Sequence, residues 1–135
     1  MPNLNGGPLC GDVRYSASND PVTTSICHCR QCQKQTGSAF VEVVAVNESD
    51  FSVQGKPQSF TYVGDSGRKK LSKFCPRCSM VVFIEAEGLA GRVLIMGGTL
   101  DDPSWPRPAM ALFCEAAQPW IASRREMTEC PRMPT

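Results

Sequence analysis

The chain has 135 residues, of which 41% are hydrophobic and 20% charged, and this composition is typical of one folded domain rather than of a disordered chain. Fourteen Lys and Arg residues against thirteen Asp and Glu residues give a formal net charge of +1, which argues against binding to nucleic acid or an acidic membrane through overall charge. We therefore expect a single domain over residues 1–135 that recognises charged ligands only locally.

The predicted elements are mostly short strands. Four segments are rich in β-branched and aromatic residues, and we expect strands at 38–46, 59–63, 80–85 and 92–97. The glycine-containing segments 64–67 and 87–91 lie between them and predict hairpin turns. The best helical candidate, 30–37, is short and ends at Gly37, a residue suited to a helix C-cap. The sequence therefore predicts an all-β fold, mainly of antiparallel hairpins, with at most short helical turns.

The remaining segments predict irregular structure and an intracellular setting. Three prolines make 101–108 an extended loop, and 128–135 reads as a loosely ordered tail. The segment MPNLNGGPLCG has neither the basic nor the continuous apolar region of a secretory signal, and nothing in the sequence predicts a membrane span. We expect a cytoplasmic protein, in which clustered thiols more often bind metal or serve catalysis than form disulfides.

The segment CHCRQC at 27–32 holds Cys27, Cys29 and Cys32 within six positions. The sulfur atoms of a C-x-x-C turn can converge on one ion, with Zn–S distances of ~2.3 Å. Three protein ligands leave a fourth position for water or substrate, which is the arrangement of a catalytic zinc site. We expect a zinc ion here.

A second set of cysteines consists of Cys75 and Cys78, in FCPRC, and Cys10 far upstream. These three predict a second metal site. The spacing leaves other interpretations open: one zinc held by four thiolates from both motifs, disulfide bonds, or buried unreactive thiols. The last interpretation is favoured for Cys114 and Cys130, which lack metal-ligand spacing.

Few residues offer themselves as general acids or bases. His28 lies between two cysteines, and in an extended chain its side chain faces the other way, which favours a hydrogen-bonding role over ligation. Asp101 and Asp102 precede Pro103, so we expect them to organise a turn. Trp105 and Trp120 are expected to pack in the core or in loops.

The sequence resembles the glutathione-dependent formaldehyde-activating enzyme family, also known as the GFA or CENP-V/GFA domain family. The resemblance rests, in chain order, on GGPLCGDVRY, CHCRQCQKQTGSAF, FCPRC, GGTLDDPSWPRP and PWI. It implies an Mss4-like β-tent fold with two zinc ions. It also implies carbon–sulfur lyase activity, in which glutathione or a similar thiol and formaldehyde or a related aldehyde form an adduct that the enzyme can also cleave.

The resemblance also implies roles for the cysteines. Cys27, Cys29 and Cys32 would hold the catalytic zinc, and Cys10, Cys75 and Cys78 would belong to the structural zinc. Two residues depart from the family pattern at the second site. Pro8 stands where a fourth ligand is expected, so the second zinc needs another group or is weak or absent. Ser79 stands where glycine usually follows the C-x-x-C, in a tight turn that favours positive φ.

The basic run RKKLSKFCPR at 68–77 offers cations for the carboxylates of glutathione. We expect Arg68, Lys69, Lys70 or Lys73 to contribute, and the alternative is a solvated strand face. The same run gives the best support to a rival function, a non-catalytic zinc-binding module that recognises a protein or nucleic acid. The near-zero net charge and the lack of aromatic residues within the run argue against nucleic acid as the partner.

Overall fold

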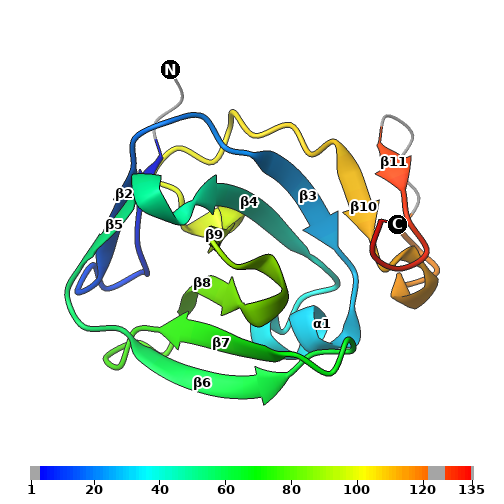
Figure 1. Cartoon of the computed structure of the whole chain (residues 1–135), viewed down its shortest axis with the longest axis horizontal. Helices are drawn as coiled ribbons and strands as arrows, with labels where there is room; N and C mark the ends of the chain where they lie inside the picture. The colour runs from blue at the N-terminus through cyan, green and yellow to red at the C-terminus, as the bar shows by residue number, and fades with distance from the viewer. Residues whose placement is uncertain (1–3, 122–126, 135) are drawn as a thin grey trace.

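The computed structural model describes residues 4–121 and 127–134, which form two β-sheets and one short α-helix (Figure 1). The small sheet has the order β1 (Asn5–Gly6), β2 (Arg14–Ala17), β5 (Phe51–Gln54). The large sheet has the order β11 (Thr128–Glu129), β10 (Met110–Leu112), β3 (Thr23–Cys27), β4 (Val41–Asn47), β9 (Arg92–Met96), β8 (Val81–Ala86), β7 (Lys69–Phe74), β6 (Gln58–Val63). The helix α1 (Arg30–Thr36) connects β3 to β4. The predicted all-β class with a short helical turn is confirmed.

Most neighbouring strands are antiparallel, as hairpin connections require. Strand β10 is different, because it lies parallel to both β3 and β11. The proline-rich segment 101–108, which is irregular as expected, carries the chain back to the edge of β3. The large sheet is strongly curved, with β3 and β4 passing over one side of the molecule and β7 and β6 over the other (Figure 1).

The alternation of side chains in the central strands separates two apolar layers. Val44 and Val46 of β4 face a core that also contains Val93 and Ile95 of β9. This core is completed by residues of the small sheet and of the 97–105 segment: Leu4, Tyr15, Phe51, Leu100 and Trp105. The opposite face of the same strands carries Val41, Val43 and Leu94, which pack against a cluster of cysteines. One sheet therefore supports the core on one face and a thiol site on the other.

The local predictions agree with the structure to within a few residues at each boundary. Helix α1 ends at Gly37, whose φ of 67° is the left-handed conformation that glycine adopts without strain. The turns expected at 64–67 and 87–91 connect β6 to β7 and β8 to β9. Part of the segment expected to be loosely ordered, 128–135, forms β11, and its last residue lies outside the described part of the chain. No helix in the described ranges is long and apolar enough to cross a membrane.

Candidate metal centres and the adjoining cavity

The thiol groups of Cys27, Cys29 and Cys32 meet at the end of β3 and the start of α1. Their three sulfur atoms lie within 4.8 Å of one another, and all three residues are buried. Apolar side chains surround the cluster, among them Val41, Ile84 and Met96. Three soft sulfur donors at this spacing fit one zinc ion, which prefers tetrahedral coordination by thiolates and nitrogen atoms.

Helix α1 fixes the positions of two of these thiols. Cys29 is the N-cap residue, and its Sγ accepts a hydrogen bond of 3.3 Å from the backbone N–H of Cys32. This pattern is the same as a serine or aspartate N-cap, with sulfur in place of oxygen. The first turn of the helix therefore returns Cys32 to the side of Cys29.

The close approach of the thiols separates their pKa values. Hydrogen bonds from the thiols of Cys27 and Cys32, together with the N–H of Cys32 and the charge of Lys70, lower the pKa of Cys29 to about 2. The hydrogen bond to Cys29 raises the pKa of Cys27 to about 11, and hydrogen bonds to both partners raise that of Cys32. Negative charge is therefore favoured on Cys29 over its two neighbours, and a bound cation favours the deprotonated form of all three.

Gln33 ties this cluster to a distant part of the chain. Its buried side-chain amide donates hydrogen bonds to the carbonyl oxygens of His28, at 2.7 Å, and Ala116, at 3.1 Å. Its Oε1 accepts a hydrogen bond of 2.9 Å from Gln118. Gln33 therefore positions the cysteine loop against the 114–118 segment, a role that the spacing of the cysteines did not indicate.

His28 is fully buried between the two cysteines, and its ring lies 5.5 Å from that of Phe40. Its backbone N–H donates to the carbonyl of Leu112 at 3.0 Å, which connects the cysteine loop to β10. His28 belongs to neither cluster of possible metal ligands that the described residues form. This position agrees with the expectation that it does not ligate.

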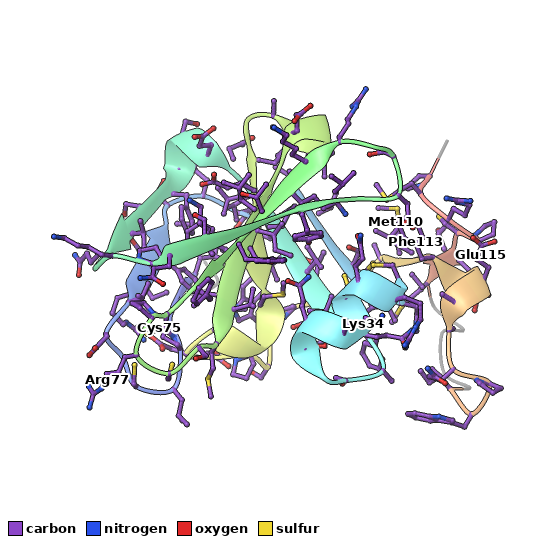
Figure 2. All side chains as sticks on the ribbon, turned by 90° about the horizontal axis from the view of Figure 1, so that it is seen from below. Lys34, Cys75, Arg77, Met110, Phe113 and Glu115 are labelled. Carbon is purple, nitrogen blue, oxygen red and sulfur yellow. The ribbon has the colours of Figure 1, made fainter. Side chains whose placement is uncertain are left out.

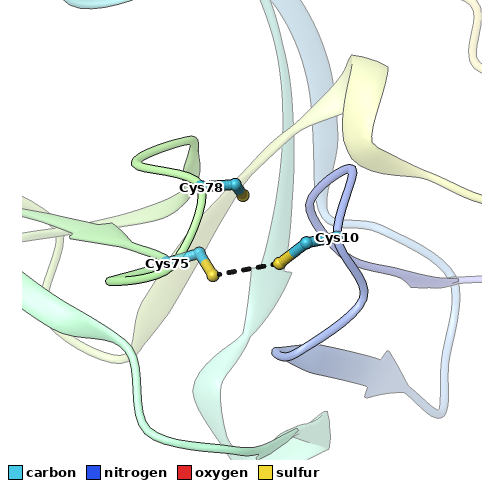
Figure 3. Close-up of side chains that lie close together, drawn as sticks. All are labelled: Cys10, Cys75 and Cys78. Carbon is cyan, nitrogen blue, oxygen red and sulfur yellow. Dashed lines mark hydrogen bonds between the residues drawn. The ribbon is translucent and has the colours of Figure 1, made fainter.

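The second cluster unites Cys10, from the loop between β1 and β2, with Cys75 and Cys78, from the turn between β7 and β8 (Figure 3). The Sγ atoms of Cys10 and Cys75 are 3.5 Å apart, and Cys75 is fully buried. The backbone N–H of Met80 and the neighbouring thiols lower the pKa of Cys78 to about 7. The two clusters are distinct groups, and Figure 2 shows Cys75 well away from Lys34 of α1 and from Phe113, which packs against the first cluster. The interpretation as a single four-thiolate site does not apply.

The described residues place no fourth cysteine, histidine or carboxylate in this second cluster. The nearby acid Asp12 forms an ion pair of 3.2 Å with Arg77. Cys114 and Cys130 lie beside each other instead, joined by a backbone hydrogen bond of 2.9 Å, and Figure 2 shows the 113–115 segment far from Cys75. Three sulfur donors fit a zinc ion with one open position more closely than the closed site expected of a structural zinc.

Ser79 follows the second pair of cysteines and has a φ of 67°. The expected positive φ is therefore present, and a residue with a Cβ atom is strained there. We predict that Ser79→Gly raises the free energy of unfolding by up to ~1 kcal/mol, because glycine removes this strain at the cost of a more flexible unfolded chain. Urea denaturation measures the change. Ser66→Gly, in a turn with no such strain, is the control and is expected to give no gain.

A cavity of about 760 Å³ opens beside the first cluster. Cys27, Cys29 and Cys32 form part of its wall. Its other walls combine apolar residues from five strands with Phe113, whose φ of 54° is unusual for a bulky side chain. The backbone N–H of Phe113 donates to the carbonyl of Arg132 at 3.3 Å, so the carboxy-terminal segment takes part in this wall.

Among the described residues, five cationic side chains line the same cavity: Arg68, Lys69, Lys70, Arg92 and Arg132. Of the four cations suggested by the sequence, Lys73 is not among the lining residues; it lies on the other face of β7 from Lys70 and Ser72, whereas Lys69 reaches the cavity from the first position of the strand. Arg92 and Arg132 also line the cavity but were not expected from the sequence. The strand period places Arg92 on the same face as Leu94, whereas no sequence signal indicates Arg132.

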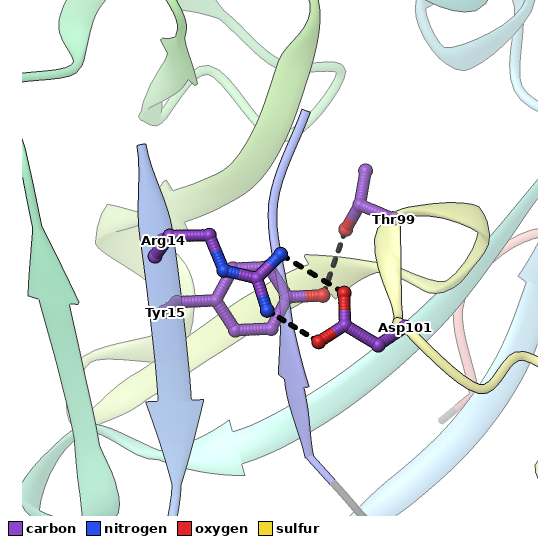
Figure 4. Close-up of polar contacts among 4 residues, drawn as sticks. All are labelled: Arg14, Tyr15, Thr99 and Asp101. Carbon is purple, nitrogen blue, oxygen red and sulfur yellow. Dashed lines mark hydrogen bonds and ion pairs between the residues drawn. The ribbon is translucent and has the colours of Figure 1, made fainter. Parts of the chain in front are cut away.

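The candidate bases Asp101 and Asp102 lie outside this cavity. Arg14 binds Asp101 through both of its terminal nitrogens and lowers its pKa, while Tyr15 Oη and Thr99 Oγ1 form a neighbouring hydrogen bond of 2.8 Å (Figure 4). Asp102 accepts hydrogen bonds from the side chain and backbone of Ser104, which lower its pKa. Asp102 therefore organises the turn, as expected, whereas the carboxylate of Asp101 ties this segment to β2. Trp105 packs against the core, and Trp120 is exposed; neither lines the cavity.

Comparison with known proteins gives one family match and a structural likeness. The family model described as "Glutathione-dependent formaldehyde-activating enzyme" (GFA) matches residues 3–116, a range that contains all six clustered cysteines. A crystal structure of a Rhodobacter sphaeroides protein is similar, with a TM-score of 0.57 and 17% sequence identity over 73% of this chain and 88% of that one. At this identity the likeness concerns the fold alone. No curated protein matches the chain.

Proposed function

Because the chain belongs to the glutathione-dependent formaldehyde-activating enzyme family, we propose that it is a zinc-dependent carbon–sulfur lyase acting on glutathione, or a similar thiol, and an aldehyde such as formaldehyde. The observation that carries this proposal is the position of three convergent thiols in the wall of a cavity lined by cations. The proposed catalytic ligands are Cys27, Cys29 and Cys32. The proposed second site is Cys10, Cys75 and Cys78.

The proposed reaction needs a nucleophilic sulfur beside a carbonyl carbon. Zinc bound by three thiolates would favour the deprotonated form of an incoming thiol. Adduct formation makes one S–C bond and converts C=O to C–OH, so the proton lost by the thiol is gained by the carbonyl oxygen. Cleavage of the adduct is the reverse reaction, and no oxidant or reductant takes part.

The protein's own residues bind and orient the substrate. Within the described part of the chain, five lining cations face one lining carboxylate, Asp65, which gives the cavity a positive potential suited to the two carboxylates of glutathione. Buried Gln33 keeps the cysteine loop in place. The basic run thus contributes to a concave small-molecule site, which favours the enzyme over the rival interpretation of a macromolecule-binding module.

Exchange spectroscopy tests the proposed activity directly. Glutathione and ¹³C-formaldehyde form the adduct reversibly without catalyst, and two-dimensional NMR measures their exchange rate at equilibrium. We expect the zinc-loaded protein to accelerate this exchange and a chelator-treated sample to lose the acceleration. Unchanged exchange together with no binding of glutathione would reject the proposed function and leave the binding-module interpretation.

Lys70 offers a test of substrate binding. We predict that Lys70→Gln raises the KM for glutathione about tenfold, because a charge-assisted hydrogen bond to a carboxylate is worth roughly 1.5–3 kcal/mol. Lys73→Gln removes the same charge from the same strand outside the cavity and is expected to leave KM unchanged. If both variants change the KM for glutathione equally, the basic run acts through general surface charge and not through a direct contact of Lys70.

The setting and extent of the domain are also proposals. We propose that the protein works in the cytoplasm, where the eight cysteines stay reduced and available to metal. We further propose that residues 1–135 form one GFA-like domain; the family match covers 3–116, and β11 extends the large sheet beyond that range.

A further inference from the structure

The floor of the cavity is an apolar surface built by the register of the large sheet. Thr23 pairs with Ala45, Ala45 with Leu94, and Leu94 with Ile84, so these four side chains form one row across β3, β4, β9 and β8. Directly paired side chains of neighbouring strands are ~5 Å apart, so the row is continuous. The next pair on this face in the direction of the thiols is Ser25 with Val43. Cys27 comes two residues after Ser25 and lies on the same face.

This apolar floor contacts the thiols themselves. Ile84 belongs to the same buried cluster as the three cysteines, and Val43, Leu94, Leu112 and Phe113 pack against that cluster. All five of these apolar residues also line the cavity. A group bonded to a sulfur at the metal centre would therefore lie against hydrocarbon on several sides.

Four of the lining cations lie beyond this floor, whereas Arg132 comes from the carboxy-terminal segment beside Phe113, near the thiols. Lys70 pairs with Ala86, and Arg92 pairs with Asn47, so both follow the apolar row on the side away from Cys27. Arg68 and Lys69 precede Lys70 at the start of β7. The cavity thus has a sulfur-binding end and an apolar floor beyond which most of its cations lie, and a ligand that fills it combines an apolar part with a negative charge.

A formaldehyde adduct uses this surface poorly. A hydroxymethyl group places only one carbon and one oxygen beyond the thiol sulfur, whereas the cavity of about 760 Å³ lies in the upper range of sites for drug-sized ligands. Apolar surface that a bound ligand leaves in contact with water contributes nothing to affinity. A larger apolar group on the same sulfur would cover Ile84, Leu94 and Leu112.

We propose that this site takes adducts of an acidic thiol with an apolar carbonyl compound of several carbons in preference to the formaldehyde adduct. The inference rests on the proposed function, since it concerns the second substrate of the same site. The carboxylates of the thiol pair with the lining cations, and the carbon chain derived from the aldehyde lies on the apolar floor.

A series of stable thioethers tests the preference without turnover. S-methyl-, S-butyl- and S-hexylglutathione keep the carboxylates and differ only in the length of the apolar group. Calorimetric titration of the zinc-loaded protein is expected to give a Kd that falls about threefold for each added methylene group from methyl to butyl. Equal Kd values across the series would overturn the inference.

Two variants locate the effect on the floor. Leu94→Gln places a polar side chain in the apolar row and is expected to flatten the dependence of Kd on chain length, because S-butyl- and S-hexylglutathione lose more affinity than S-methylglutathione. Val53→Ser, at a half-exposed position of the small sheet, is the matched control and is expected to keep the full dependence. If both variants lose the dependence of Kd on chain length, or if both keep it, the apolar floor is not the surface that contacts the carbon chain.

The same titration separates this inference from the proposed function. Acceleration of glutathione–formaldehyde exchange with no dependence on chain length leaves the proposed function standing and rejects the apolar substrate. Failure of every glutathione derivative to bind, together with no acceleration, rejects both.

Discussion

Replacing Cys29 with serine is expected to remove one zinc ion per chain and to lower kcat/KM by at least about 100-fold. Loss of a residue that supports a metal site from outside already costs about 10–100-fold in metal affinity or activity, and loss of a ligand costs more. Cys29 is the appropriate choice, because its buried sulfur lies between those of Cys27 and Cys32 in sequence and also caps α1, a role that serine can keep.

Elemental analysis and the exchange assay measure the two effects on the same sample. Cys114→Ser is the matched control, since Cys114 is a cysteine outside both clusters and hydrogen-bonds to the carbonyl of Ala111. The control is expected to keep its zinc and its activity. Full zinc content and full activity in Cys29→Ser would mean that the first cluster is not the catalytic metal centre.

The second large effect is expected at Cys75, and it concerns stability rather than activity. Cys75 is fully buried and joins the turn after β7 to the loop between β1 and β2 through its contact with Cys10. A ligand that binds only the folded state at 1,000 times its Kd stabilises it by about 4 kcal/mol. We therefore predict that Cys75→Ser, and chelation of the wild type, lower Tm by about 10 °C.

The variant Pro8→Cys tests whether this second site lacks one ligand. Pro8 stands at the position where the family resemblance places a fourth cysteine, and the described residues supply no substitute. We expect Pro8→Cys to tighten zinc binding and to slow zinc release to a chromogenic chelator, whereas Leu9→Cys, one residue further along, does neither. A Tm that responds neither to Cys75→Ser nor to chelators would show that this cluster holds no metal in the protein.

The two cysteine clusters illustrate how far local sequence can lead. Cys27, Cys29 and Cys32 are close in sequence, and a β-strand followed by one helical turn is enough to bring their sulfur atoms together. The φ of Ser79 was also predictable, because the geometry of a tight turn after C-x-x-C is local. Cys10 is 65 residues from Cys75, so the sequence could suggest their grouping but no local geometry brings them together.

The cavity shows where the sequence alone was insufficient. Lys70 and Lys73 look equivalent in the basic run, but the strand period places them on opposite faces of β7, and only the fold decides which face meets the thiols. Arg92 and Arg132 come from segments 40 residues apart and meet at one cavity because β9 and the carboxy-terminal segment border the same concave face.

The sequence by itself determined the all-β class, the short helix ending at Gly37 and the local grouping of Cys27, Cys29 and Cys32, because turn residues, strand propensity and ligand spacing act over a few residues. Only the tertiary structure decided that β10 lies parallel to β3, that no fourth ligand joins Cys10, Cys75 and Cys78 in the described residues, and that an apolar floor lies between the thiols and most of the cations. These features depend on which strands become neighbours and in which register, and that choice is made by burial of the whole core rather than by any one segment.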